Sequence, residues 1–377
     1  MRGFRALKDI ELSTPGLTAL VGPNGVGKST VLDAFVFLRN AALHGVDVAV
    51  KNEAGIGRLK TRGWRGPVEL ALEFDLHYGD DEPVAGVYQL AIDDLRGRVV
   101  VEKERLEVAQ RNGSMTTLID GRRGRCRLAD PAGNLHERMQ SAGTLTLSRL
   151  DPSTQQDYPV ATDLRDALTE IVLIDRDPVF SQGLGLNVPV AGEDRKRRGA
   201  EPVDQVLRAV VAEQGLIDKL ALVAKEFIPD IETIRRVTRT GREPELEVVE
   251  RGGGELRVEE LSAGTRQLLL LAAVWLRPRP PTLVLLEEPD AGVHPGGHTA
   301  LRDLLRSIAK RSVVVLTTHS PAFVGLLDPE TEVIALERGA DGVQLRSFAA
   351  AMRQSGWLKA FGTGADAFVR SASEKKP

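Results

Sequence analysis

A glycine-rich stretch between an apolar run and an apolar helical pattern constrains the fold more than any other part of the chain. Residues 22–29 read GPNGVGKS and fit the pattern G-x-x-x-x-G-K-[ST], and the apolar run LTALV precedes them at 17–21. Glycines there let backbone N–H groups turn toward phosphate oxygens, and the start of the following helix adds its positive dipole end. We expect Lys28 to reach the β- and γ-phosphates of a nucleotide and Ser29 to bind Mg²⁺. The residues expected to hold the nucleotide are Gly22, Pro23, Asn24, Gly25, Val26, Gly27, Lys28, Ser29 and Thr30.

Two acidic residues end another candidate strand. The continuous apolar run at 282–286 leads into Glu287 and Glu288, and a second such run lies at 313–317. Runs of this kind are typical of parallel strands covered on both faces, and the spacing of leucines over 301–308 predicts a helix between them. Ligands of such sheets bind at the carboxyl ends of the strands. Because adjacent strand residues point to opposite faces, we expect one carboxylate to bind Mg²⁺ and the other to polarise water.

Two further candidates follow the same order along the chain. Ser262 is a natural N-cap for the apolar helix expected at 266–276, and Gly264 leaves the backbone open to a close approach. A capped helix start is itself an anion site. His319 follows the run at 313–317, where the ligand edge of the sheet is expected. Each residue alone also fits a structural role, and their position after a phosphate loop favours the nucleotide site.

The middle of the chain is patterned differently. Residues 68–76 and 87–92 predict half-buried strands of an antiparallel patch, whereas 109–147 are rich in Gly and Arg and weakly patterned. Three further elements are predicted: an exposed loop at 183–202, a helix at 204–227, and a hairpin formed by 245–250 and 255–258.

Composition indicates a globular chain without disulfides. Hydrophobic residues make up 42% and charged residues 27%, which excludes a wholly disordered or membrane-spanning chain. The single cysteine, Cys126, excludes an intramolecular disulfide and thiolate metal clusters. The start MRGFRALKDI has no apolar signal-peptide stretch, and the longest apolar run, 268–276, is too short to span a bilayer, so we expect a cytoplasmic protein with no membrane partner. The net charge of −3 gives no overall field for nucleic acid.

Together the four motifs resemble an ABC-type ATPase head: the phosphate loop, the signature LSAGT, the acidic strand LVLLEEP and the switch TTHS. Within that class the chain resembles the RecF/SMC/OLD-like branch, the bacterial AAA family ATPases, whose form EEP-x-x-G-x-HP matches residues 287–295. The resemblance implies an α/β fold, a P-loop NTPase ABC-type head with a mostly parallel core sheet, an antiparallel β patch and a helical signature lobe. The head would comprise 1–180 and 245–350, with an inserted helical and loop region at 181–244 and a C-terminal helical tail at 351–377.

The resemblance also implies roles for the candidate residues, with ATP and Mg²⁺ as the ligands. These roles are phosphate and Mg²⁺ binding for Lys28 and Ser29, positioning of the attacking water for Glu288, sensing of the γ-phosphate for His319, and capping of ATP held by a partner head for Ser262 and Gly264. ATP would then join two copies in a homodimer or a higher oligomer. Glu287 stands where relatives usually carry a metal-binding Asp, so its carboxylate lies one methylene further out.

Other classes of ATPase fit less well. Transporter subunits place the phosphate loop and the signature much closer together in sequence than Lys28 and Ser262. The long arms of DNA-repair heads need sustained heptads, and none occur. Too few residues follow His319 for the nuclease domain of OLD-type proteins, and Asp175 with Asp177 is a weak indication of a nuclease site.

Two functional classes stay open. The first is an ATPase that acts on DNA in genome maintenance or anti-phage defence together with an effector protein from a neighbouring gene. The second is a nucleotide-gated scaffold or regulator of such an effector, without direct nucleic-acid binding. Basic clusters would contact a phosphate backbone in the first class, although a charged run is also typical of a solvated face. The clusters are Arg58, Lys60, Arg62 and Arg65 around Trp64; Arg122, Arg123, Arg125 and Arg127; Arg195, Lys196, Arg197 and Arg198; and Arg235, Arg236, Arg239 and Arg242.

Overall fold

The polypeptide passes several times between two structural units. The computed structural model describes residues 1–78, 82–110, 112–130, 132–176, 203–228, 230–238, 244–339 and 342–348. Within these ranges, unit 1 is drawn from Met1–Leu12, Ser29–Ile171 and Arg338–Gln344, and unit 2 from Ser13–Lys28, Val172–Glu337 and Leu345–Pro377.

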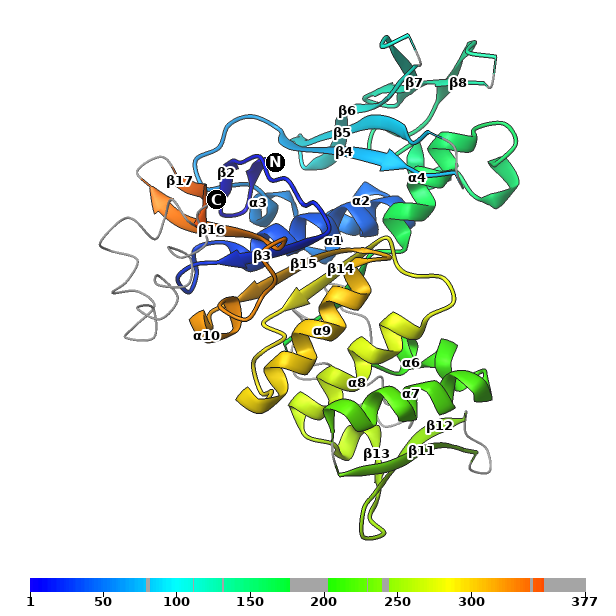
Figure 1. Cartoon of the computed structure of the whole chain (residues 1–377). Helices are drawn as coiled ribbons and strands as arrows, with labels where there is room; N and C mark the ends of the chain where they lie inside the picture. The colour runs from blue at the N-terminus through cyan, green and yellow to red at the C-terminus, as the bar shows by residue number, and fades with distance from the viewer. Residues whose placement is uncertain are drawn as a thin grey trace. The chain divides into compact units, whose positions relative to one another are not determined.

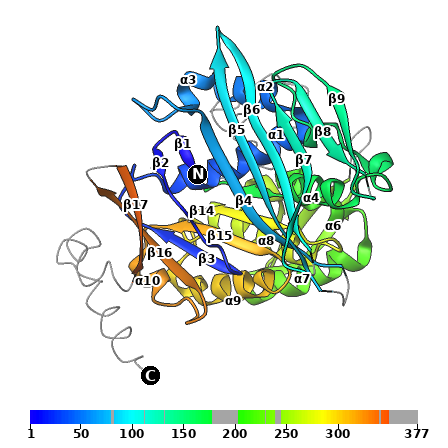
Figure 2. The same ribbon diagram turned by 90° about the horizontal axis from the view of Figure 1, so that it is seen from above.

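Unit 1 is built on an antiparallel sheet, whose long strands lie side by side in Figure 2. Along the sixth strand of the chain, the buried residues Glu104, Leu106 and Val108 alternate with more exposed ones, as expected of a sheet with one covered face. The described strands follow one another across the sheet as β2 (Leu7–Asp9), β1 (Arg2–Phe4), β4 (Val68–Leu76), β5 (Val84–Leu95), β6 (Arg98–Ala109), β7 (Met115–Arg122), β8 (Arg125–Ala129) and β9 (Leu135–Met139).

Helices of unit 1 accompany this sheet. Phe37 of the first helix packs edge to face on Phe4 of β1, with ring centroids 6.0 Å apart. The helical segments described here are α1 (Lys28–His44), α2 (Val46–Asn52), α3 (Ile56–Leu59), η1 (Leu147–Arg149), η2 (Pro152–Thr154) and α4 (Pro159–Thr169). The division between the units passes through α1, between Lys28 and Ser29.

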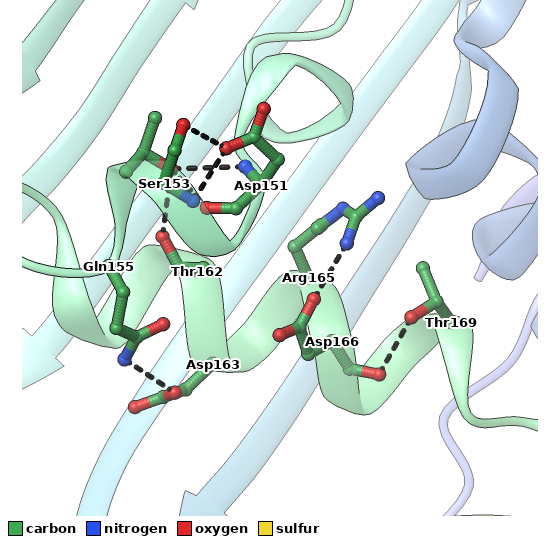
Figure 3. Close-up of polar contacts among 9 residues, drawn as sticks. Asp151, Ser153, Gln155, Thr162, Asp163, Arg165, Asp166 and Thr169 are labelled. Carbon is green, nitrogen blue, oxygen red and sulfur yellow. Dashed lines mark hydrogen bonds and ion pairs between the residues drawn. The ribbon is translucent and has the colours of Figure 1, made fainter.

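Local polar contacts fix η2, the short helical turn that precedes α4 (Figure 3). Asp151 accepts a hydrogen bond from the backbone N–H of Ser153 at 2.8 Å, and the hydroxyl of Thr154 accepts one from the backbone N–H of Asp151 at 3.0 Å. This reciprocal pattern satisfies N–H groups that a helix start leaves unpaired. One turn later the Gln155 amide donates to Asp163 at 2.9 Å, which ties η2 to α4.

Most of the core sheet belongs to unit 2 (Figure 1). Its order across the sheet is β10 (Val172–Ile174), β14 (Leu283–Glu287), β15 (Val313–Thr318), β3 (Leu17–Val21), β16 (Glu332–Gly339) and β17 (Gly342–Ser347). The first five strands run parallel to one another. Every residue of β3 and β10 is buried, which is typical of parallel strands covered on both faces.

A helical lobe shares one apolar core with this sheet. The core joins β3, β10, β14 and β15 to the helices and to a small antiparallel sheet. The further elements of unit 2 are α6 (Val203–Val211), α7 (Gln214–Phe227), β11 (Ile231–Val237), β12 (Glu245–Glu250), β13 (Glu255–Arg257), η3 (Val258–Glu260), α8 (Ala263–Leu276), η4 (Pro295–Gly297), α9 (His298–Ala309) and α10 (Pro321–Val324). Figure 1 shows α7 between α8 and the small sheet.

The fold class predicted from the sequence is confirmed: an α/β head with a mostly parallel core sheet, an antiparallel sheet and a helical lobe that carries the signature. The prediction of one helix over 204–227 is wrong, because Glu213 takes an extended conformation and separates α6 from α7. The expected loop at 183–202 and the tail at 351–377 lie outside the described residues, and the division into a head and an insert at 181–244 stays a prediction.

Candidate nucleotide-binding site

Four neighbouring strands of unit 2 end at one edge of the core sheet. Parallel strands present their carboxyl ends at the same edge, and β10, β14, β15 and β3 are adjacent and parallel. Arg176 comes shortly after β10, Glu288 directly after β14, His319 directly after β15, and residues 22–28 directly after β3. The fold thus brings three predicted site residues, Lys28, Glu288 and His319, to one edge.

The loop after β3 adopts conformations that favour glycine. Gly22, Gly25 and Gly27 have φ angles of 152°, 70° and 122°. A Cβ at Gly22 would lie 2.5 Å from the backbone oxygen of Leu336 in β16, so no side chain fits there. Across the predicted loop, Pro23, Asn24 and Gly25 are exposed, Gly22, Val26, Gly27 and Lys28 are buried, and Ser29 and Thr30 are half-buried in the first turn of α1.

The Lys28 amine is held inside its own loop. Its Nζ donates hydrogen bonds to the carbonyl oxygens of Gly22 at 2.8 Å and Pro23 at 3.0 Å. Burial lowers the pKa of Lys28 to about 8, although the carboxylates of Glu288 and Glu287 act in the opposite direction. The amine is therefore a desolvated cation close to two acids, which is suited to receive a more highly charged anion.

Glu288 leaves the strand geometry that the sequence suggested. β14 ends at Glu287, and Glu288 has a φ of 47°, so the alternation of faces does not extend to it. Its backbone N–H donates to the carbonyl oxygen and to the hydroxyl of Thr317, both at 3.1 Å. Its carboxylate contacts Arg176 Nη1 through Oε2 at 3.0 Å and His319 Nε2 through Oε1 at 3.0 Å. The neighbouring strands on both sides of β14 thus supply partners for this carboxylate.

The surroundings of His319 favour the neutral imidazole. Burial lowers its pKa, and the charges of Lys28 and Arg176 lower it further, against the opposite effect of Glu288 and Asp290. With Nε2 3.0 Å from the carboxylate of Glu288, the neutral ring carries its proton on Nε2 and donates it as a hydrogen bond. A hydrogen-bond donor therefore stands beside the carboxylate at the strand ends.

Ser262 and Gly264 organise the start of α8. The Ser262 hydroxyl accepts a hydrogen bond from the backbone N–H of Thr265 at 3.2 Å, as predicted for an N-cap. A Cβ at Gly264 would lie 2.2 Å from the backbone oxygen of Gly292, so this glycine packs directly on the loop after β14. Ser262 is exposed, and among the described residues no recorded contact joins it to Lys28.

Neither Arg176 nor Asp290 is predicted as a site residue by the sequence. Burial raises the pKa of Asp290, and its Oδ1 has no hydrogen-bond partner among the described residues. Asp290 lies within the EEP-x-x-G-x-HP form at 287–295, so the sequence offers a reason to consider it as a site residue. No motif in the sequence marks Arg176, because its place beside Glu288 depends on the pairing of β10 with β14.

Comparison with known proteins supports the assignment of this fold to ATP binding. The family described as "AAA domain, putative AbiEii toxin, Type IV TA system" matches residues 17–325, a span that includes the phosphate loop, the signature and the switch histidine. This chain belongs to that family. It is a P-loop ATP-binding head of the ABC type.

Individual relatives are more distant. The phosphate import ATP-binding protein PstB of Pyrococcus furiosus is 39% identical over 62 residues, which cover 16% of this chain and 24% of that protein. The chain thus spans about a quarter of the length of this curated relative. An SMC head bound to the C-winged helix domain of ScpA aligns over 93% of this chain and 97% of its own, with a TM-score of 0.47 and 17% identity. The SMC head domain from Thermotoga maritima aligns over 92% of this chain and 96% of its own, with a TM-score of 0.41 and 14% identity.

Four of the described basic residues in the predicted clusters form ion pairs with acidic side chains. The ion pairs are Lys60–Asp93 at 2.5 Å, Arg123–Glu102 at 2.7 Å, Arg127–Asp120, and Arg235 with Glu247 at 2.7 Å and Glu255 at 2.6 Å. Arg195, Lys196, Arg197, Arg198, Arg239, Arg242 and Asp177 lie outside the described residues. In the described part of the chain, no helix has the length and apolar character needed to cross a membrane.

Proposed function

We propose that the chain binds and hydrolyses ATP with Mg²⁺ at the edge of the core sheet in unit 2. The placement of the Lys28 amine, the Glu288 carboxylate and the His319 ring at adjacent strand ends carries this proposal. A cation for the phosphates, an acceptor for a water proton and a donor for the γ-phosphate are the groups that phosphoryl transfer to water needs.

Lys28 and its loop would hold the triphosphate. An ammonium group has three N–H donors, and Lys28 uses two of them on Gly22 and Pro23. The third would bind a phosphate oxygen, together with backbone N–H groups of the loop and the start of α1. Because the amine is desolvated, its interaction with phosphate is stronger than it would be in water.

Ser29 and Glu287 fit a magnesium ion. Mg²⁺ usually takes one or two oxygen ligands from the protein and completes its shell with phosphates and water. Ser29 offers a hydroxyl in the first turn of α1, and Glu287 offers a half-buried carboxylate whose charge reaches the Lys28 amine. Bound Mg²⁺ would neutralise charge that develops on the β- and γ-phosphates.

Hydrolysis would use Glu288 and His319. A water oxygen attacks the γ-phosphorus, the bond from that phosphorus to the bridging oxygen breaks, and ADP leaves with the bond's electron pair. The proton lost by water passes to the Glu288 carboxylate. His319 Nε2–H, now 3.0 Å from Glu288, would donate to a γ-phosphate oxygen.

We further propose that two heads dimerise around ATP. Ser262 is exposed at the capped start of α8, and the positive end of a helix dipole favours an anion. In the proposed dimer, Ser262 and Gly264 of one chain would close over the ATP held by Lys28 of the other.

The biological role we propose is anti-phage defence or DNA maintenance with a partner effector, and the toxin–antitoxin description of the family favours defence. A nucleotide-gated scaffold without direct nucleic-acid binding is the second candidate. The ion pairs of Lys60, Arg123, Arg127 and Arg235 with acids favour it, because a neutralised cation releases fewer counterions on binding DNA. Binding to DNA at low salt with ATP present would favour the first role, and its absence the second.

The experiment that tests ATP hydrolysis compares Lys28→Ala with Glu288→Gln. Lys28→Ala should lose ATP binding, because it removes the buried cation. Glu288→Gln should keep ATP binding and lose about a hundredfold or more in turnover, because an amide cannot accept the proton of water. Turnover is measured as phosphate release and binding by calorimetry.

Matched controls carry the same charge changes on the exposed surface of unit 2. Lys310→Ala and Glu330→Gln should leave both binding and turnover at wild-type values, because both side chains are exposed and outside the site. Wild-type turnover by Glu288→Gln would show that the assigned base is wrong.

A further inference from the structure

Both oxygens of the Glu288 carboxylate are already engaged. Oε2 pairs with Arg176 Nη1 and Oε1 with His319 Nε2, each at 3.0 Å. The Glu288 side chain is 19% exposed, whereas that of Arg176 is 63% exposed. A mostly solvated cation from the neighbouring strand end therefore holds a mostly buried carboxylate.

This arrangement conflicts with the proposed role of Glu288. A general base must stand within hydrogen-bond reach of the water proton that it accepts. His319 is expected to turn toward the γ-phosphate, which frees Oε1, but an arginine is always charged and would continue to hold the other oxygen. The ion pair therefore fixes the carboxylate in its present orientation until the pair weakens.

We propose that Arg176 is a positioning residue that restrains Glu288 in the nucleotide-free protein and releases it when the γ-phosphate binds. This inference rests on the proposed ATP hydrolysis. The γ-phosphate carries more negative charge than a carboxylate and would enter beside Lys28, so it competes with Glu288 for the N–H of His319 and repels the carboxylate from its present position. Arg176 can leave without a large packing cost, because most of its side chain is in water.

The restraint predicts a specific effect on affinity. If ATP binding has to break the Arg176–Glu288 pair, then removing the pair beforehand should tighten binding. Exposed ion pairs contribute little, so Arg176→Gln should lower the Kd for a β,γ-imido ATP analogue with Mg²⁺ by about two- to fivefold. The KM for ATP should fall by the same factor, and kcat should stay within about twofold because the pair is already broken in the ATP-bound state.

A double-mutant comparison separates this role from others. Glu288→Gln also removes the ion pair, so adding Arg176→Gln in that background should leave the Kd of the analogue unchanged. Arg176→Lys keeps the charge and should lie between wild type and Arg176→Gln. Arg306→Gln is the matched control: Arg306 pairs with Asp328 at 3.6 Å and is 59% exposed, and its loss should change nothing.

Three outcomes would overturn the restraint. Weaker binding of the analogue in both backgrounds would make Arg176 a phosphate ligand, an unchanged Kd in both would make the pair merely structural, and a large fall in kcat would place Arg176 in the chemical step. Failure of the proposed function is distinct from all three, because wild type would then bind no analogue and Lys28→Ala would have no effect.

Discussion

At the scale of single residues, the buried Lys28 amine makes nucleotide affinity sensitive to pH. Burial lowers the pKa of Lys28 to about 8, so the amine loses its charge as the pH rises through that value. Bound phosphates favour the charged form, and ATP binding above pH 8 must therefore take up a proton. We expect ATP affinity to be nearly constant between pH 6.5 and 7.5 and to fall by up to about tenfold per pH unit above about 8. Calorimetry in buffers of different ionisation enthalpy measures both effects, and a constant affinity up to pH 9.5 would contradict the prediction.

A second residue, Glu104 in unit 1, is expected to contribute to the free energy of unfolding. Its carboxylate is fully buried. It accepts hydrogen bonds from the backbone N–H groups of Thr146 at 2.7 Å and Leu147 at 2.8 Å, one on each oxygen. Glu104→Gln places an NH₂ group against one of these donors, so we expect the free energy of unfolding to fall by about 1–3 kcal/mol. The exposed residue Glu137 in β9 is the control, and Glu137→Gln should change it by less than about 0.5 kcal/mol in urea unfolding.

Residues fixed by local chemistry could be predicted from the sequence, and residues fixed by distant pairing could not. Ser262 was predicted as a cap because its hydrogen bond reaches only three residues ahead. Lys28 and its glycines follow from the local pattern in the same way. Arg176 contacts Glu288 only because β10 pairs with β14. Nothing near Arg176 in the sequence indicates that pairing.

At the scale of elements, the contact between α8 and the loop after β14 limits position 264 to glycine. A Cβ at Gly264 would lie 2.2 Å from the backbone oxygen of Gly292, and backbone cannot move aside as a flexible side chain can. We expect Gly264→Ala to lower the free energy of unfolding by about 1–3 kcal/mol. Thermal unfolding and ATP turnover would both report the loss.

Gly215 provides a matched control, since it also occupies the second position of a helix. The nearest atom to a Cβ at Gly215 is 4.0 Å away. Gly215→Ala should therefore stabilise the protein by about 0.5–1 kcal/mol, because alanine reduces the conformational freedom of the unfolded chain. Equal effects of the two substitutions would show that the Gly264 contact is unimportant.

Elements with continuous apolar runs were predicted, and those with mixed patterns were not. β14 and β15 are buried along nearly their whole length and stand out in the sequence. β7, β8 and β9 occupy the weakly patterned segment, and all five residues of β9 are exposed, so no alternation marks that strand. The break between α6 and α7 was missed because apolar spacing continues to Val211, whereas the break depends on the extended backbone at Glu213.

At the scale of the whole molecule, the proposed dimer predicts complementation between two inactive variants. Lys28→Ala and Ser262→Arg should each be nearly inactive alone. In the mixed dimer one site carries both defects and the other carries neither, so mixing should restore about a quarter of the wild-type turnover if chains exchange at random and one site can act alone.

The control mixes wild type with the double variant Lys28→Ala/Ser262→Arg, whose mixed dimer contains no intact site and should gain no activity. Full activity of Ser262→Arg alone would exclude the shared site. Absence of complementation despite demonstrated chain exchange would indicate that the sites act only as a pair or that the partner is another protein.

The strand order of the core sheet also has a consequence for biosynthesis. The two neighbours of β3 in the sheet, β15 and β16, are synthesised about 300 residues after β3 itself. Until then β3 is an apolar segment with both hydrogen-bonding edges unpaired, and such a segment can pair with other chains and aggregate. Pairings so distant in sequence also slow folding. The phosphate loop after β3 therefore gains its supporting sheet only after β15 and β16 have been synthesised.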